Sequence, residues 1–235
     1  MFMPTARRNR KIHTRHESWA ELDIAVAKMP EGQRKIFEAA VDEFADLGFA
    51  GSSTLAIAER AGVSEGLIFK YFKSKAALFN QVVFPILARA IMPLVIRGVK
   101  SVTNAEHQSF AEFIEALIRE RLDFARRHKR HLRILLQELP LNAELRTRML
   151  KGLQAELLPV ISQKIIHYQK LGELRAMPVD QMLSYLLPQI MGFVLSRAMF
   201  AYEFAANETQ DIKTLIAVMV HGVGKSKQTT RRGIK

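Results

Sequence analysis

The side chains best suited to chemistry lie close together in residues 64–75, which read SEGLIFKYFKSK. This stretch supplies hydroxyl, carboxylate, ammonium and aromatic groups at helical spacing. No Gly-rich phosphate loop, nucleophile elbow or paired-acid cluster stands out in the sequence, so we expect no enzyme. Such groups on the open face of a helix instead suit contacts with the base edges and phosphates of DNA.

The residues just before this stretch predict how it is positioned. Ala58 and Gly62 are four residues apart in apolar surroundings. The small side chain of Ala58 lets a following helix cross closely, and Gly62 can take the positive φ of a tight turn. Ser64 then caps a second helix. The pattern fits a helix-turn-helix, although the Ala58–Gly62 spacing alone fits an ordinary helical hairpin better.

A wider set of motifs favours the helix-turn-helix. Residues 34–79 resemble the DNA-binding domain of TetR regulators through RKIFEAA, FADLGF, IAERAGVS and YFKSK. The GELR turn at residues 172–175 is a weaker similarity. The resemblance implies a transcriptional regulator that binds a double-stranded DNA operator as a homodimer and needs no cofactor.

The resemblance also implies which residues contact DNA. It assigns base edges and nearby phosphates to the open face of the second helix, and further phosphates to the starts of the helices on either side. The implied DNA-binding residues are Ser53, Thr54, Ser64, Glu65, Gly66, Leu67, Phe69, Lys70, Tyr71 and Lys75. Ile68 and Phe72 are expected on the buried side of the same helix.

Two of these positions have alternative interpretations. Glu65 can accept a hydrogen bond from a cytosine amino group, or it can simply favour the positive end of its own helix. Phe69 stands where many TetR regulators have tyrosine, so a hydroxyl-to-phosphate contact is absent there. Its ring is expected either to stack on a sugar or methyl group or to extend the core of the small domain.

Apolar residues recur at helical spacing almost throughout the chain, which predicts an all-α fold. We expect an N-terminal three-helix helix-turn-helix DNA-binding domain followed by a larger helical ligand-binding and dimerisation domain. The predicted regions are a basic arm and lead-in (1–30), the DNA-binding domain (31–80), the effector-binding and dimerisation domain (81–224) and a basic tail (225–235). The predicted long helices are 31–47, one from about 74 that bends at Pro85 and Pro93, 110–128, 129–138, 144–170, 179–204 and 211–222.

The formal net charge of +12 is concentrated at the two ends of the chain. Residues 1–16 contain five Lys and Arg residues and no acid, and residues 225–235 contain the same numbers. Basic ends fit either a role in solubility or binding to nucleic acid. The chain has no cysteine and no stretch that fits a signal peptide or a membrane span, so we expect a cytoplasmic protein without membrane contact.

The second domain is expected to hold a dimer interface and an effector pocket. The dimer interface is placed on apolar faces of the last two long helices, at Leu186, Ile190, Phe193, Val194, Arg197, Phe200, Leu215, Val218 and Met219. A hydrophobic effector pocket is placed at Phe110, Phe113, Leu117, Met149, Leu153, Met191 and Met199. For any one of these pocket residues, an ordinary core position is the commoner role.

The leading functional hypothesis is a repressor that a hydrophobic small-molecule effector releases from its operator. The alternatives are a DNA-binding regulator without a small-molecule ligand and a helical carrier of hydrophobic ligands. His128 and His131, with Glu138 downstream, invite a metal-site interpretation. Their strongly basic surroundings oppose a cation, so we expect no metal.

Overall fold

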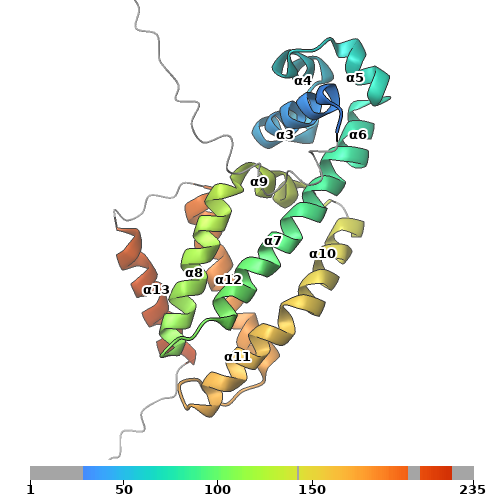
Figure 1. The fold of residues 1–235 in the computed structure, drawn as a ribbon. Helices are drawn as coiled ribbons and strands as arrows, with labels where there is room; N and C mark the ends of the chain where they lie inside the picture. The colour runs from blue at the N-terminus through green and yellow to red at the C-terminus, as the bar shows by residue number, and fades with distance from the viewer. Residues whose placement is uncertain (1–28, 142, 201–206, 224–235) are drawn as a thin grey trace, which may run out of the picture.

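The described part of the chain consists of helices and no strands, as the sequence predicts (Figure 1). The computed structural model describes residues 29–141, 143–200 and 207–223. The N-terminal elements are α3 (Glu31–Gly51), α4 (Thr54–Ala61), α5 (Glu65–Tyr71), α6 (Lys75–Leu78) and the π-helical segment η1 (Phe79–Val83). They are followed by α7 (Phe84–Asn104), α8 (Phe110–Arg127), α9 (Lys129–Glu138), α10 (Ala143–Glu156), α11 (Leu158–Lys170), α12 (Val179–Ala198) and α13 (Glu208–Val223). The predicted basic arm and basic tail lie outside the described residues.

Helix α3 supports α4 and α5 through an apolar stripe. Phe37, Val41 and Phe44 lie on this stripe and are almost completely buried. Regular helical geometry breaks at Gly48, where φ is +72°, a conformation that glycine adopts without the strain a side chain would cause. Ser52 stabilises this end because its hydroxyl donates to the carbonyl groups of Gly48 and Glu43.

Segments α6, η1 and α7 form one run of helix that joins the N-terminal elements to the rest of the molecule (Figure 1). The sequence predicts that this helix bends at Pro85 and Pro93. The backbone widens to π-helical geometry over Phe79–Val83, directly before Pro85, whose nitrogen has no hydrogen to donate to the preceding turn. Pro93 is accommodated inside α7.

Two predicted helices have the wrong extent. Residues 144–170 form two helices that meet at Leu157, because Pro159 in the first turn of α11 cannot continue the hydrogen-bond ladder of α10. The helix predicted over residues 179–204 ends at Ala198, and Met199 and Phe200 lie in a turn. Residues 201–206 lie outside the described residues.

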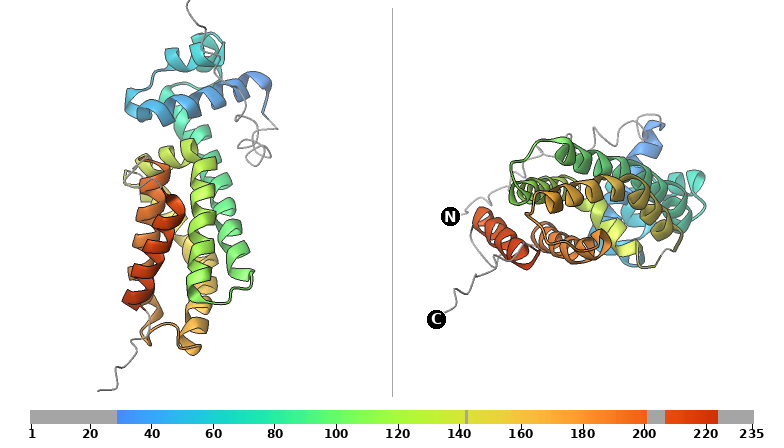
Figure 2. Two further views of the ribbon diagram at one scale, coloured as in Figure 1. Left: turned by 90° about the vertical axis from the view of Figure 1, so that its left-hand side faces the viewer. Right: turned by 90° about the horizontal axis from the view of Figure 1, so that it is seen from below.

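The hydrophobic core consists of two clusters, and the first extends across the predicted domain boundary. Buried residues of α3 to α6 and η1 pack in one cluster with apolar residues of the second domain, namely Ile91, Leu94, Phe124, Ile134 and Leu135. The carboxylate of Asp42 on α3 also pairs with the guanidinium of Arg130 on α9. The second cluster lies between α8, α11, α12 and α13, and Figure 2 shows α12 and α13 lying along α8. The N-terminal helices therefore pack directly onto α7 and α9.

None of the helices in the described ranges is long and apolar enough to cross a membrane.

Candidate nucleic-acid interface

Helices α4 and α5 form the helix-turn-helix that the sequence predicts. Gly62 ends α4 with a φ of +67°, and its N–H donates to the carbonyl of Glu59 at 3.2 Å. The N–H of Val63 donates to the carbonyl of Ala58 at 3.0 Å, which closes the tight turn. Ala58 is buried where the two helices approach each other, as expected for a small side chain at this position.

Helix α5 has one buried face and one open face. Ile68 and Phe72 are 0% and 6% exposed and belong to the core beneath the helix, which confirms the predicted orientation. On the open face, Phe69 is 48% exposed, Tyr71 is 37% exposed and Lys70 is exposed. Phe69 therefore does not extend the core, which removes one of its two alternatives.

The remaining positions on α5 support this open face. Gly66 is exposed, and a side chain added there would meet only the Ser64 hydroxyl, at 4.0 Å, so the backbone of α5 is open to a partner on this side. Leu67 is partly buried and packs against the core, at the flank of the open face.

Two serines cap the N-terminal ends of α4 and α5. The Oγ of Ser53 accepts from the N–H of Ala56 at 3.0 Å, and the Oγ of Ser64 accepts from the N–H of Leu67 at 3.3 Å. Both side chains are exposed. Because each hydroxyl uses only a lone pair in its cap, its hydrogen stays available to donate to a phosphate.

Thr54 and Glu65 bind each other. The hydroxyl of Thr54 donates to Oε1 of Glu65 at 2.6 Å, and both side chains are partly buried. The single hydroxyl hydrogen of Thr54 is thereby used, so in this conformation Thr54 cannot also donate it to a phosphate. Sequence reasoning missed this bond because the two residues are eleven positions apart.

Lys75 has an intramolecular role that the sequence did not reveal. Its ammonium donates to the carbonyls of Phe49 and Ser52, at 2.7 Å each, and lies 4.6 Å from the centroid of the Phe49 ring. These carbonyls follow the break at Gly48, where backbone acceptors lack helical partners. The predicted phosphate contact of Lys75 would have to use its one remaining N–H.

The predicted dimer residues divide between the interior and the surface. Leu186, Ile190, Val194 and Met219 are at most 4% exposed and form part of the second core, so their assignment to an interface is wrong for these four. Phe193 and Leu215 are partly buried against the same core, and Arg197 pairs with Asp211. The sequence could not distinguish the inner face of each helix from its outer face, because both faces are apolar.

The outer faces of α12 and α13 carry other apolar side chains. Phe200 and Val218 are exposed as predicted, at 69% and 61%. Tyr185, Leu187 and Met191 on α12 are exposed as well, and the sequence analysis did not assign them to the dimer interface. Several exposed large apolar side chains on one region of the surface are typical of an interface with another chain.

The predicted pocket residues lie in different parts of the described structure. The Phe110 ring packs edge to face with Tyr168, and the Phe113 ring lies tilted against it. Leu117 is buried in the same core, and Leu153 and Met199 lie at its margin. Met149 packs on the first core, and Met191 is 45% exposed. None of the seven residues lines either of the two cavities described below.

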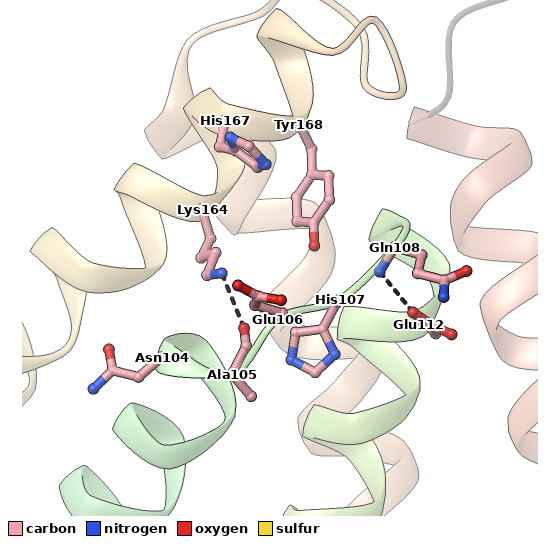
Figure 3. Close-up of a pocket in the computed structure, with 9 residues that line it drawn as sticks. All are labelled: Asn104, Ala105, Glu106, His107, Gln108, Glu112, Lys164, His167 and Tyr168. Atoms are coloured by element: carbon pink, nitrogen blue, oxygen red, sulfur yellow. Dashed lines mark hydrogen bonds between the residues drawn. The ribbon is translucent and has the colours of Figure 1, made fainter.

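One of these cavities is a polar cleft where α7 ends, α8 begins and α11 ends (Figure 3). It has a volume of about 750 Å³, and its lining includes His107, Lys164 and the buried Tyr168. Burial raises the pKa of Tyr168, and the nearby carboxylates of Glu173 and Glu112 raise it further. A second cavity, of about 640 Å³, lies between α7 and Glu156 at the end of α10. The linings of both cavities are more polar than the predicted hydrophobic pocket.

Sequence reasoning also missed a buried ion pair between Glu120 and Arg121 of α8, on the side that faces α7. Arg121 is 8% exposed, its Nε donates to Glu120 at 2.5 Å, and its guanidinium lies 4.6 Å from the centroid of the Phe124 ring. Burial lowers the pKa of Arg121, and the carboxylate of Glu120 opposes that effect. Gly98 on α7 leaves space for the ends of both side chains. The adjacent opposite charges were visible in the sequence, but their burial was not.

His131 lies where α9 packs on α3. It is 3% exposed, and its ring centroid lies 6.1 Å from that of His128. Burial lowers the pKa of His131 to about 4, and the neighbouring His128 and Arg130 act in the same direction. Among the described residues there is no group of three or more His, Cys, Asp or Glu side chains able to hold a metal ion.

The helix-turn-helix geometry and the helical second domain define a class of DNA-binding regulator, and comparisons with known proteins show its relatives. Residues 36–82 match the family described as "Bacterial regulatory proteins, tetR family". The regulator RutR of Escherichia coli K12 is 32% identical over 150 residues, which are 63% of this chain and 66% of RutR, slightly less than two thirds. The chain is thus similar to TetR regulators over residues 36–82, and its similarity to RutR extends beyond them.

Solved structures of other regulators share the fold. The fatty acid degradation regulator FadR from Bacillus halodurans matches with a TM-score of 0.59 and 19% identity, over 83% of this chain and 97% of FadR. The ketosteroid regulator KstR2 of Mycobacterium tuberculosis matches with a TM-score of 0.56 and 17% identity, over 83% of this chain and 95% of KstR2. At these identities the similarity concerns the fold alone.

Proposed function

We propose that this protein is a transcriptional regulator that binds a double-stranded DNA operator as a homodimer and reads bases with α5. The observation that carries the proposal is the composition of the two faces of α5. Ile68 fixes the helix to its core at 0% exposure, while the neighbouring Phe69 and Lys70 are exposed. A short helix that is held rigidly and presents aromatic and cationic side chains suits the major groove.

In this proposal, different residues on and around α5 contact the phosphates, the sugars and the base edges. Lys70 and the hydroxyls of Ser53 and Ser64 are placed to contact phosphates, which sets the position of the protein on the duplex. Tyr71 and Phe69 are placed to contact sugars and base edges, and Gly66 allows close approach of the backbone. The carboxylate of Glu65, oriented by Thr54, is placed to accept from a cytosine amino group.

A homodimer explains the exposed apolar faces of α12 and α13. Leu187, Met191 and Val218 lie on these faces and are 38%, 45% and 61% exposed in the single chain. Pairing them with a second copy removes apolar surface from water, which favours association. Two copies related by a two-fold axis then present two α5 helices to half-sites about one turn of DNA apart.

A hydrophobic small-molecule effector is the proposed signal for release. The first core joins α5 to α7 and α9 without a flexible linker, so a ligand that displaces α7 or α9 changes the spacing of the two reading helices. A regulator without a small-molecule ligand is the alternative.

Selection of duplexes from a randomised pool tests the proposed function. The wild-type protein is expected to enrich a two-fold symmetric sequence, with half-sites about 10 bp or a multiple of that apart. Lys70→Ala should weaken binding to the enriched duplex, while Lys170→Ala, the same change at the exposed end of α11, should leave it intact. Failure of the wild-type protein to enrich any sequence would contradict the proposal.

A further inference from the structure

The polar cleft between the α7–α8 connection and α11 has no part in the proposed reading of DNA. It lies at the end of the molecule opposite α4 and α5 (Figures 1 and 3). Its volume of about 750 Å³ is within the range of sites that bind small molecules. Its lining is mostly polar, unlike the apolar pocket expected for a hydrophobic effector. The cleft therefore suits a polar ligand.

The hydroxyl of Tyr168 is a buried hydrogen-bond donor that points into this cleft (Figure 3). Tyr168 is 1% exposed, and no described residue forms a hydrogen bond with its hydroxyl. Most buried side-chain polar groups do have such a partner. Burial and the carboxylates of Glu173 and Glu112 raise the pKa of Tyr168, so the hydroxyl keeps its hydrogen at neutral pH. The cleft thus contains a donor that needs an acceptor from a ligand.

Lys164 adds a second donor on the same face of α11. It precedes Tyr168 by four residues, a spacing that makes two side chains neighbours on the surface of a helix. The ammonium of Lys164 donates to the carbonyl of Ala105 over a long 3.4 Å, and it forms no ion pair with a described residue. Two of its three N–H groups are left for a ligand. An ammonium beside a hydroxyl donor suits a carboxylate.

The opposite wall, formed by the α7–α8 connection and the start of α8, accepts hydrogen bonds. It contains the carboxylates of Glu106 and Glu112, neither of which forms an ion pair with a described residue. One oxygen of Glu112 accepts from the N–H of Gln108 at 2.7 Å, which leaves the other oxygen for a ligand. Nε2 of His107 donates to the carbonyl of Val102 at 2.9 Å, so Nδ1 of the neutral ring is an acceptor. This wall suits an ammonium group.

The charges of the two walls disfavour simpler ligands. With the histidines neutral, Lys164, Glu106 and Glu112 give the lining a formal charge of −1. The two carboxylates repel a simple anion, and a simple amine leaves the Tyr168 hydroxyl without an acceptor. The charge of Glu112 acts on that hydroxyl although no hydrogen bond joins the two groups, so they are near each other. A ligand with a carboxylate and an ammonium close together satisfies both.

We propose that this cleft binds a free α-amino acid. Its carboxylate accepts from the hydroxyl of Tyr168 and the ammonium of Lys164, and its ammonium donates to Glu112 and to Nδ1 of His107. The inference goes beyond the proposed function and does not depend on it, because none of these four residues lies in α4 or α5.

Binding of pure compounds to the full-length protein tests the inference. Thermal melting first screens each of the twenty proteinogenic amino acids at about 5 mM, since a specific ligand stabilises the folded state. Calorimetry then measures the affinity for the most stabilising amino acid, and for the amine and the carboxylic acid that lack one of its two charged groups. We expect a dissociation constant below about 1 mM for the amino acid and at least about tenfold weaker binding of both analogues.

Matched variants test whether the amino acid binds in this cleft. Tyr168→Phe removes a hydroxyl without a described partner, so it should melt like wild type and bind the amino acid at least about fivefold more weakly. Tyr185→Phe, the same change at an exposed position on α12, should leave the affinity unchanged. Lys164→Met should weaken binding about tenfold, and Lys151→Met, at an exposed position on α10, should not.

Three results would overturn the inference. The first is that no amino acid binds, and the second is that the amine or the carboxylic acid binds as tightly as the amino acid. The third is an unchanged affinity in Tyr168→Phe or in Lys164→Met. If Tyr168→Phe fails to fold, Lys164→Met decides. None of these results depends on whether the protein selects an operator, so the proposed function and this inference can fail separately.

Discussion

The hydroxyl of Thr54 donates a 2.6 Å hydrogen bond to Oε1 of Glu65 and so joins the first turn of α4 to the first turn of α5. The bond holds a carboxylate at the edge of a surface that is proposed to meet phosphates. This carboxylate repels DNA wherever no base donates to it. Under the proposed function, Glu65 favours selectivity at the expense of general affinity for DNA.

Glu65→Gln should raise the affinity for a scrambled duplex about two- to fivefold at low salt, because it removes one negative charge from the interface while keeping an acceptor for Thr54. Fluorescence anisotropy measures this change. Glu106→Gln removes the same charge at the exposed α7–α8 connection and should leave the affinity unchanged. An equal gain in both variants would show that net charge alone is responsible.

Lys75→Met should lower the free energy of unfolding by about 2 kcal/mol, because the carbonyls of Phe49 and Ser52 lose a charged donor. Denaturant melts monitored by circular dichroism measure the loss. Lys73→Met, at an exposed position two residues earlier, should change stability by less than about 0.5 kcal/mol. Equal stability of the two variants would contradict the structural role of Lys75.

His131 should make the protein less stable in mild acid. Its pKa in the folded chain is about 4, below the ordinary value of 6.5, so between these values the unfolded chain binds more protons. The free energy of unfolding should therefore fall by up to about 3 kcal/mol as the pH decreases from about 6.5 to 4. Melts of wild type and His131→Leu over this range measure the effect, and His167→Gln is the exposed control. An unchanged pH dependence in His131→Leu would contradict this explanation.

Val218→Arg should convert the proposed dimer to a monomer, because it places a charge on the exposed apolar face of α13. Light scattering after size exclusion measures the mass, and thermal melting shows whether the fold persists. Leu171→Arg, which adds the same charge at a position that is 58% exposed after α11, should leave the mass unchanged. A wild-type protein that is monomeric at micromolar concentration would contradict the proposed dimer.

The turn, the cap and the buried face of the α4–α5 segment were predicted because local rules determine them, while the choice of a helix-turn-helix over an ordinary hairpin came from the wider resemblance to TetR regulators. Gly62, Ser64, Ile68 and Phe72 act through a turn, a cap and a buried face, each of which is visible within a few residues. The same rules placed the start of α12 and the extents of α8 and α9. The split at Leu157 was missed because the periodicity on both sides is continuous and only Pro159 marks it.

Features that depend on distant partners could not be predicted. The bond between Thr54 and Glu65 and the contacts of Lys75 with α3 require knowledge of how three helices cross. In α12, apolar residues occupy the inner and the outer face, so the buried Leu186 and the exposed Leu187 look alike in the sequence. The burial of Arg121 depends on Gly98, which is 23 positions away.

Fluorescence anisotropy of the purified protein tests most directly whether α5 reads DNA. Wild type and Tyr71→Ala are compared on DNA from the protein's own upstream region and on a scrambled duplex of the same length. Each is measured at two salt concentrations. We expect wild type to prefer the upstream DNA at least about a hundredfold, within the range of specific DNA-binding proteins, and Tyr71→Ala to lose most of this preference while melting cooperatively. Equal affinity of wild type for the two duplexes, or an unchanged preference in Tyr71→Ala, would contradict the assignment of α5 as the helix that reads DNA.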